Sequence, residues 1–242
     1  MAKNYWKLIN KVIDESDVIM IVLDARFYKE SINKDIEKLI KEKNKKFLYV
    51  INKIDMLTFD KQKEIKLNPS IQVSAAQRLS TTRLLKKLLQ FSNGRQITVG
   101  VLGYPNTGKS SIINALKGRH SAKASSESGY TKGLQKIRVH KRILLIDSPG
   151  VFPRKEFDEV KHTLISAKDI TKIKDPELAA MEIIKELNGK VEEYYDVPIS
   201  SDLEKTLELI ALKKKALKKG AIPDTTKIAK QIILEFQKGN IS

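Results

Sequence analysis

The sequence predicts an α/β fold, in which helices cover both faces of a mostly parallel sheet, followed by a small all-helical C-terminal domain. Apolar runs without polar alternation, as in DVIMIVLDAR, are typical of strands buried on both faces of a parallel sheet. Segments with helical spacing separate these runs. From about Pro176 only helical patterns remain, so we expect the two domains to span residues 1–172 and 173–242.

Two helix–strand pairs begin the predicted order. Apolar side chains at helical spacing predict a first helix over Asn4–Asp14, and the apolar run Val18–Leu23 predicts the first buried strand. Ser31 is the expected N-cap of a second helix that continues to residue 46, because isoleucine and leucine side chains share one face there. The apolar residues 47–51 form the second expected strand.

The middle of the chain continues the alternation. A weaker helical stretch follows Thr58, and residues 71–76 (IQVSAA) read as a strand and a loop. The next helix spans residues 81–91 and is closed by Asn93 and Gly94, since both residue types tolerate the left-handed conformation that ends helices.

The strand ITVGVLG, residues 97–103, leads through a loop into a helix that begins near Lys109. A polar, serine-rich stretch at residues 121–133 is an expected mobile loop, and strands are expected at residues 134–140 and 143–147. In the C-terminal domain three helical patterns cover residues 176–189, 202–220 and 225–239, and Gly220 and Pro223 separate the last two.

Charge and composition narrow the class of protein. Forty-six Lys and Arg against 29 Asp and Glu give a formal net charge of +17, which favours nucleic acid as partner, with an anionic membrane surface as the alternative. A lysine-rich proteome would raise the charge without any such contact. The absence of cysteine excludes disulfides and thiolate metal sites. No apolar run is long enough to span a membrane, and the N-terminal residues lack signal-peptide features, so we expect a cytoplasmic protein. We also expect it to be a monomer.

A phosphate-binding motif lies between the strand at residues 97–103 and the following helix. GYPNTGKS matches G-x-x-x-x-G-K-S, in which backbone N–H groups face phosphate oxygens, Lys109 balances the β- and γ-phosphate charge and the Ser110 hydroxyl binds Mg²⁺. A glycine turn without a ligand is the alternative. The expected phosphate-binding residues are Asn106, Thr107, Gly108, Lys109, Ser110 and Ser111.

An Mg²⁺–phosphate site also needs a carboxylate at the end of a neighbouring strand. Asp147 supplies it and forms D-x-x-G with Gly150, whose amide is expected to sense the γ-phosphate. Thr131, in the polar loop, is a further expected Mg²⁺ ligand, although other Ser and Thr residues there compete with it. Lys109, Thr131 and Gly150 are therefore the expected catalytic residues, and Ser110, Thr131 and Asp147 the expected metal ligands.

The segment that selects the base lies upstream, at the end of the second strand. In NKID the Asp55 carboxylate accepts two hydrogen bonds from guanine N1–H and the 2-amino group, which adenine cannot offer. Asn52 is expected to brace neighbouring loops, and the aliphatic stem of Lys53 to cover the base. About twenty residues later, Ser74, Ala75 and Ala76 are positioned to offer guanine O6 a backbone N–H.

These parts occur once each, in the order base-reading segment, SAA, phosphate loop, threonine loop and D-x-x-G. In most GTPases the base-reading segment follows the phosphate loop. One set of parts argues for one domain, and joining the ends of an ordinary G domain and cutting after D-x-x-G produces this order. Such a change is physically reasonable because the termini of compact domains commonly lie close together. The sequence therefore predicts a circularly permuted P-loop GTPase domain.

With these motifs in this order, the chain resembles the circularly permuted GTPases of the YlqF/RbgA type. The resemblance covers nearly the whole chain and includes DAR at 24–26, NKID, SAA, GYPNTGKSS, GYTKG, DSPG and a helical tail ending in QKGNIS. Ser128 departs from it, since family members often have proline there. The resemblance implies a role in assembly of the large ribosomal subunit, with its precursor and rRNA as partners, and a K⁺ ion held with the help of Asn106.

Val151 stands where Ras-like enzymes place a water-orienting glutamine. An aliphatic side chain cannot orient water, so we expect a low intrinsic rate of GTP hydrolysis; the resemblance implies stimulation by ribosomal particles and K⁺. The expected ligands are GTP or GDP and Mg²⁺. The alternatives are a GTP-gated RNA-binding protein not tied to ribosome assembly and a membrane-associated GTPase that uses its basic tail. The lysines in 213–219 are either an RNA-backbone surface or a solvated helix face.

Overall fold

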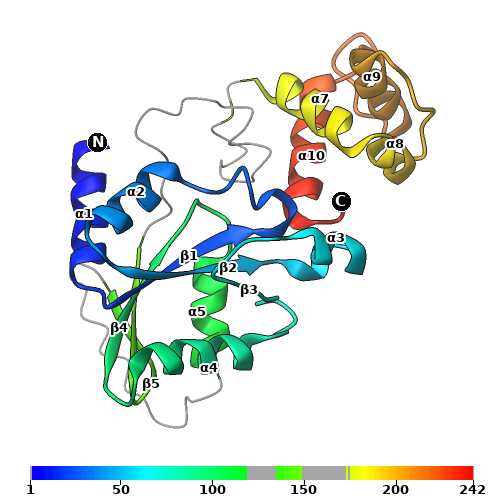
Figure 1. The fold of residues 1–242 in the computed structure, drawn as a ribbon. Coiled ribbons are helices and arrows are strands. Elements are labelled where there is room, and N and C mark those ends of the chain that lie inside the picture. The colour runs from blue at the N-terminus through cyan, green and yellow to red at the C-terminus, as the bar shows by residue number, and fades with distance from the viewer. Residues whose placement is uncertain (1, 119–134, 149–172, 174, 242) are drawn as a thin grey trace. The chain divides into compact units, whose positions relative to one another are not determined.

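The computed structural model describes residues 2–118, 135–148, 173 and 175–241 (Figure 1). The chain divides into two compact units, residues 1–156 and residues 157–242. The expected boundary at residue 172 falls outside the described residues and stays a prediction. So do the mobile loop expected at 121–133 and the position of Val151.

Unit 1 contains a six-stranded sheet in the order β3-β2-β1-β4-β6-β5. All neighbouring strands are parallel except β5 and β6, which are antiparallel. The strands are β1 (Val18–Asp24), β2 (Lys46–Asn52), β3 (Ser70–Gln72), β4 (Ile97–Leu102), β5 (Gln135–His140) and β6 (Ile143–Asp147). The predicted fold class is confirmed. From β1 the chain adds β2 and β3 on one side, and the later strands follow on the other side, beginning with β4. Ligands of open α/β sheets bind beyond the carboxyl ends of the strands at such a change of direction.

Helices cover both faces of this sheet (Figure 1). Figure 1 shows α1 (Ala2–Asp14) and α2 (Lys34–Glu42) on one face, and α4 (Thr81–Ser92) and α5 (Lys109–Lys117) on the other. Alternate side chains of β1 enter two separate cores: Ile19, Ile21 and Leu23 pack with α1 and α2, whereas Val18, Met20 and Val22 pack with α4 and α5. The unbroken apolar run of β1 is thus explained by burial on both sides.

The expected cap of α2 is wrong. The helix begins at Lys34, and the Asn33 side chain caps it by accepting hydrogen bonds from the N–H groups of Asp35 (3.1 Å) and Ile36 (3.2 Å). The Ser31 hydroxyl instead donates to the carbonyl of Tyr28. Asn33 has the extended backbone that an N-cap requires, and its side-chain oxygen reaches the free N–H groups of the first turn. The helix also ends earlier than expected, at Glu42.

Between β2 and β4 the chain forms α3 (Phe59–Glu64), and short 3-10 turns follow β1 (Ala25–Phe27) and β2 (Ile54–Met56).

Unit 2 is helical in the part that the structure describes, with α7 (Pro176–Leu187), α8 (Lys190–Tyr195), α9 (Leu203–Lys213) and α10 (Thr225–Lys238). Its buried core includes Ile183, Ile210, Ile232 and Phe236. The helical pattern missed α8. It also extended α9 too far: after Lys213 the chain turns, and Leu217 pairs with Pro223 in an antiparallel bridge. Ala216, buried at the start of this turn, fixes the chain against the core.

Candidate functional site

The loop from Gly103 to Gly108 joins β4 to α5 and requires glycine at both ends. Gly103 has φ +148°, and a Cβ there would lie 2.4 Å from the Val22 carbonyl oxygen. Gly108 has φ +90°, and a Cβ there would lie 2.2 Å from Asn52 Nδ2. Both positions therefore combine a backbone conformation that favours glycine with a close approach that excludes any side chain. The loop is held against the ends of β1 and β2, as the phosphate-binding motif requires.

Asn52, the last residue of β2, joins three segments that are far apart in the sequence. Its Nδ2 donates to the carbonyl of Thr107 (2.9 Å), and its Oδ1 accepts from the N–H of Ala75 (3.0 Å). The side chain is buried, with 2% of its surface exposed. The base-reading segment, the SAA segment and the phosphate loop thus meet at the carboxyl ends of the parallel strands. The side-chain amide of Asn52 connects all three segments.

The side chain of Lys53 is held by Asp24, at the end of β1. Lys53 Nζ lies 2.8 Å from Asp24 Oδ2, and Arg26 contacts both carboxylate oxygens through Nε (3.0 Å) and Nη2 (2.8 Å). Asp24 is fully buried. Burial acts to raise the pKa of Asp24, but the hydrogen bonds and charges of Arg26 and Lys53 outweigh it and the pKa is lowered. The carboxylate therefore stays charged and holds both cations in place.

Lys109 and Asp147 face each other across the ends of β4 and β6. Lys109 Nζ donates to the carbonyls of Gly103 (3.0 Å) and Tyr104 (2.7 Å). Burial lowers the pKa of Lys109 to about 8, although the charge of Asp147 acts in the opposite direction. Burial also raises the pKa of Asp147, and Lys109 and the Ser148 N–H offset only part of the shift. A phosphate beside the amine and a cation beside the carboxylate would each favour the charged form.

Two carboxylate oxygens in this site have no partner. Asp55 Oδ1 and Asp147 Oδ1 are buried, and each lacks a hydrogen bond among the residues that the structure describes. Buried acceptors in native proteins are normally satisfied, so each of these oxygens requires an explanation. One lies where guanine N–H groups are expected, and the other where Mg²⁺ is expected. The residues present therefore fit a guanine nucleotide with a divalent cation.

The other predicted site residues are placed as follows. Asn106, Ser110, Ser111 and Ala76 are exposed, and Thr107 and Ser74 are buried. The Thr107 hydroxyl donates to the Tyr104 carbonyl (3.0 Å), and Ser74 Oγ accepts from the Gln77 N–H (3.0 Å), so both hydroxyls support their loops. Thr131 and Gly150 lie outside the described ranges, and their roles stay predictions.

Asp24 was not among the predicted site residues. The signal available in the sequence was that Asp24 ends an apolar strand, as Asn52 and Asp147 do. Asp24 pairs in register with Asn52, so the two polar ends lie side by side. A second support is the Ser148 hydroxyl, which donates to the Val101 carbonyl (2.5 Å) and ties the end of β6 to β4.

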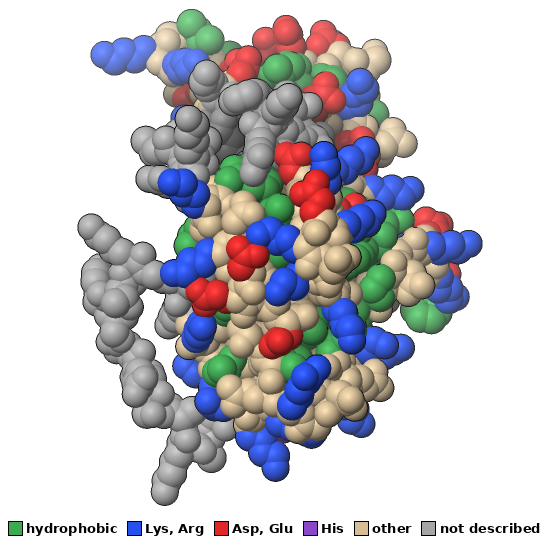
Figure 2. Space-filling view, turned by 60° about the vertical axis from the view of Figure 1, so that its left-hand side comes forward, with side chains coloured by type: hydrophobic (Ala, Val, Ile, Leu, Met, Phe, Trp, Pro, Cys, Tyr) green, Lys and Arg blue, Asp and Glu red, His purple; other side chains and the backbone are tan. Residues whose placement is uncertain are grey.

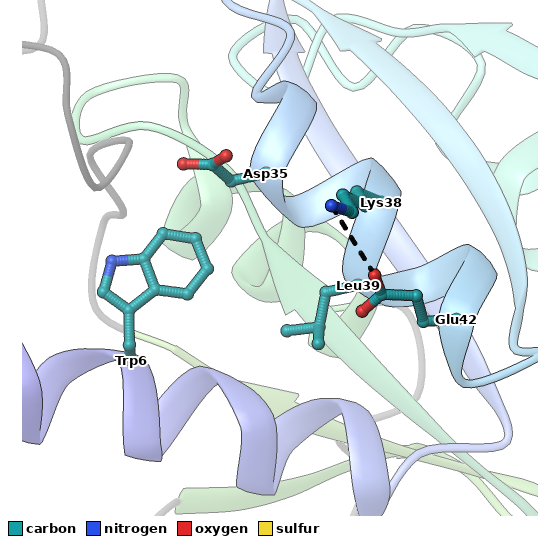
Figure 3. A pocket seen from close by; sticks show the side chains of 5 residues that line it. All are labelled: Trp6, Asp35, Lys38, Leu39 and Glu42. Atoms are coloured by element: carbon teal, nitrogen blue, oxygen red, sulfur yellow. Dashed lines mark ion pairs between the residues drawn. The ribbon is translucent and has the colours of Figure 1, made fainter.

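A pocket of about 210 Å³ lies between α1 and α2 (Figure 3). It is lined by Trp6, Asp35, Lys38, Leu39 and Glu42, and Lys38 is paired with Glu42 at 3.9 Å. None of the described nucleotide-site residues lines it, so we assign it no part in nucleotide binding.

Gly108→Ala is expected to weaken GDP binding at least tenfold, because the new Cβ would displace the Asn52 amide and break its bond to Thr107. Gly94→Ala is the matched control: Gly94 has a similar φ of +85° but nothing within 4 Å of an added Cβ. Both variants should lose about 1 kcal/mol of stability from backbone strain. Gly108→Ala should lose more, because it also breaks a buried hydrogen bond, and only this variant should lose affinity. Isothermal titration with GDP makes the comparison. Equal affinities in the two variants would contradict the role given to Asn52.

The chain is similar to several known proteins. Residues 98–211 match the family described as 50S ribosome-binding GTPase. An uncharacterized GTP-binding protein of Methanocaldococcus jannaschii is 39% identical over 246 residues, which cover 98% of this chain and 65% of that protein. Nucleolar GTP-binding protein 2 of Saccharomyces cerevisiae is 34% identical over 255 residues, covering 99% of this chain and 52% of that protein. The chain thus spans between half and two-thirds of the length of these relatives.

Among solved structures, YlqF from T. maritima has the same fold. Its GNP-bound form aligns with a TM-score of 0.68 at 24% identity, over 98% of this chain and 94% of that one. Its GDP-bound form aligns with a TM-score of 0.69, over 96% and 94%. Among the described residues, no helix is long and apolar enough to cross a membrane.

Proposed function

We propose that this chain is a circularly permuted GTPase of the YlqF type, that it hydrolyses GTP to GDP and phosphate, and that it acts in the assembly of the large ribosomal subunit. The observation that carries the proposal is the junction at Asn52, where base-reading and phosphate-binding segments meet at the edge of the sheet that also carries Asp55 and Asp147. Each of these two residues has a buried carboxylate oxygen without a hydrogen-bond partner among the described residues. Relatives named as GTP-binding proteins support guanine nucleotide as the ligand.

The nucleotide would be held at three places. Asp55 would accept hydrogen bonds from the guanine edge, with the stem of Lys53 against the base and the SAA backbone near guanine O6. The N–H groups of residues 106–111 and the Lys109 amine would bind the phosphates. Lys109 now donates to two loop carbonyls and is buried, so it is already positioned and needs little reordering to meet a phosphate.

The Mg²⁺ site would consist of Asp147, Ser110 and Thr131, together with phosphate oxygens. Hydroxyl and phosphate oxygens are hard ligands of the kind that Mg²⁺ prefers. When bound, Mg²⁺ neutralises charge that develops on the phosphates during transfer. The Gly150 amide would sense the γ-phosphate, and Asn106 would help to hold K⁺.

Hydrolysis would be slow without a partner. Val151 offers no hydrogen bond to orient the attacking water, so the chain itself supplies positioning and charge but little activation of the nucleophile. The relatives' names, one family described as 50S ribosome-binding and one protein as nucleolar, support a pre-ribosomal particle as that partner. The tail lysines in 213–219 are the expected rRNA contact. Part of their positive charge is neutralised, since Lys213 pairs with Asp196 and Lys218 with Asp224.

GTP turnover is expected to rise at least tenfold when large ribosomal subunits are added, and to be faster in K⁺ than in Na⁺. Phosphate release measured with and without subunits, in both salts, checks this. Small ribosomal subunits serve as the control for non-specific RNA. Turnover that no ribosomal particle stimulates, combined with GTP-dependent binding to RNA, would favour the alternative of a GTP-gated RNA-binding protein. The cytoplasmic, monomeric state stays a prediction.

A further inference from the structure

Acidic residues are almost absent from the middle of the chain. Residues 65–146 contain 15 Lys and Arg and one acidic residue, Glu127, whereas residues 1–64 contain 14 Lys and Arg and 11 Asp and Glu. The two stretches therefore have similar numbers of basic residues and very different net charge. Because α1 and α2 come from the first stretch and α4 and α5 from the second, the fold separates these compositions onto opposite faces of one sheet (Figure 1).

The solvent face of α4 shows this imbalance most clearly. Leu84, Leu85 and Leu88 are buried against the sheet. The exposed positions of the helix are Thr82, Arg83, Lys86, Lys87 and Gln90, so every charged side chain on this face is basic. Arg83 is three and four residues from Lys86 and Lys87, a spacing that places side chains about 5–6 Å apart. We call these exposed residues, with the flanking Arg78 and Arg95, the α4 face.

Further basic side chains extend the α4 face at both ends. Arg78 lies beside the end of α5, since a Cβ on Gly118 would be 3.7 Å from its Nη2, and Lys117 precedes that glycine. At the other end, the N–H of Ile97 donates to the Arg142 carbonyl (2.9 Å), which brings the turn between β5 and β6 next to Arg95. Lys141 is exposed in that turn. The charge therefore continues along and beyond a helix about 18 Å long.

Among the described residues of unit 1, no carboxylate pairs with a cation of the α4 face. Within residues 2–118 and 135–148, no ion pair involves Arg78, Arg83, Lys86, Lys87 or Arg95. On the opposite face, by contrast, Lys11 pairs with Glu15 and Lys38 with Glu42. In the space-filling view, Lys and Arg dominate the charged side chains of the lower end of unit 1 (Figure 2). An uncompensated surface of this kind raises the local concentration of polyanions.

We propose that the α4 face binds the phosphate backbone of RNA; this rests on the proposed function, because the RNA would belong to the pre-ribosomal particle. The side chains between the cations, Thr82 and Gln90, are uncharged hydrogen-bond donors suited to phosphate and sugar oxygens. An anionic membrane fits less well, because a helix that lies on a membrane needs a large exposed apolar face, whereas α4 buries Leu84, Leu85 and Leu88 and presents mostly charged and polar side chains to solvent. The contact would add to any made by the C-terminal lysines and would be independent of the nucleotide site.

The test compares two triple variants that remove the same charge from opposite faces. Arg83→Gln/Lys86→Gln/Lys87→Gln changes the α4 face, and Lys34→Gln/Lys38→Gln/Lys41→Gln changes exposed lysines of α2. Affinities for a short RNA duplex and a single strand of the same length are measured between about 50 and 200 mM salt. We expect the α4 variant to bind at least tenfold more weakly, with a salt slope smaller by about two to three, and the α2 variant to bind within threefold of the wild type.

Equal weakening in both variants would overturn the proposal, because net charge and not the α4 face would then govern binding. Undiminished RNA affinity in the α4 variant would also overturn the proposal. If this variant instead loses binding to phosphatidylserine vesicles, the α4 face is a membrane-binding surface. GDP affinity and the melting temperature confirm that both variants fold. GTP turnover with large subunits is measured in parallel. If the subunits do not stimulate turnover but RNA binding depends on the α4 face, only the proposed ribosomal function is contradicted. If the subunits stimulate turnover but RNA binding does not depend on the α4 face, only this inference is contradicted.

Discussion

Asp55→Asn is expected to lower the affinity for GDP more than a hundredfold and to create affinity for xanthosine diphosphate. The Asp55 carboxylate would accept from both guanine N1–H and the 2-amino group, and its Oδ1 is buried without a partner among the described residues. An asparagine turns an amide N–H₂ toward the 2-amino group, so a donor faces a donor. Xanthine has a carbonyl at that position and restores the pairing. The asparagine oxygen can still accept from N1–H, but as a neutral acceptor. Loss of one hydrogen bond to a charged group, weakening of the other and an unpaired 2-amino group together correspond to about 3 kcal/mol or more.

Competition binding with GDP and xanthosine diphosphate measures both halves of this exchange. Asp60→Asn is the matched control, since Asp60 is exposed and pairs only with Lys63, at 3.6 Å. The control should bind GDP as the wild type does. A variant that loses affinity for GDP without gaining affinity for xanthosine diphosphate would contradict the predicted pairing and indicate a general disruption of the loop. Unchanged GDP affinity would remove Asp55 from the base site.

Asp24→Asn is expected to destabilise unit 1 by about 3–5 kcal/mol, because it removes the buried negative charge that pairs with both Arg26 and Lys53. Arg26 and Lys53 side chains are 4% and 17% exposed, and both pair with Asp24. Lys53 would also lose the contact that holds it at the base site, so GDP affinity should fall in the folded variant. Urea unfolding at neutral pH gives the change in stability, and fluorescence titration of the folded fraction gives the affinity.

The stability difference between wild type and Asp24→Asn should depend on pH. The pKa of Asp24 is lowered in the folded protein, so its contribution is complete above the unfolded value of about 4 and is lost as pH falls through the folded value. Asp14→Asn is the control, because Asp14 pairs with Lys43 at the surface with 58% of its side chain exposed. That pair should contribute less than about 1 kcal/mol. If the two variants lose equal stability, Asp24 does not hold the cluster.

Most of the fold of unit 1 was predictable because its signals are local. Strands buried on both faces need continuous apolar runs, and β1, β2, β4 and β6 all have them. Element ends were less predictable. Ser31 and Asn33 are both good N-caps, and only the path of the chain after β1 decides which one meets the first turn of α2. The end of α9 depended likewise on Ala216 packing into the core of unit 2.

The sequence by itself determined the strand–helix order, the motifs and the permuted arrangement, since each is a property of short segments and their succession. The tertiary structure decided which polar side chains meet. Asn52, Thr107 and Ala75 are hydrogen-bonded across gaps of 55 and 23 residues, and Asp24 holds Lys53 and Arg26 only because β1 and β2 end at the same edge. Spacing along the chain does not encode such contacts; the order and register of the strands in the sheet produce them. The same sheet placed α4 and α5, which come from the acid-poor residues 65–146, on one face and so formed the α4 face.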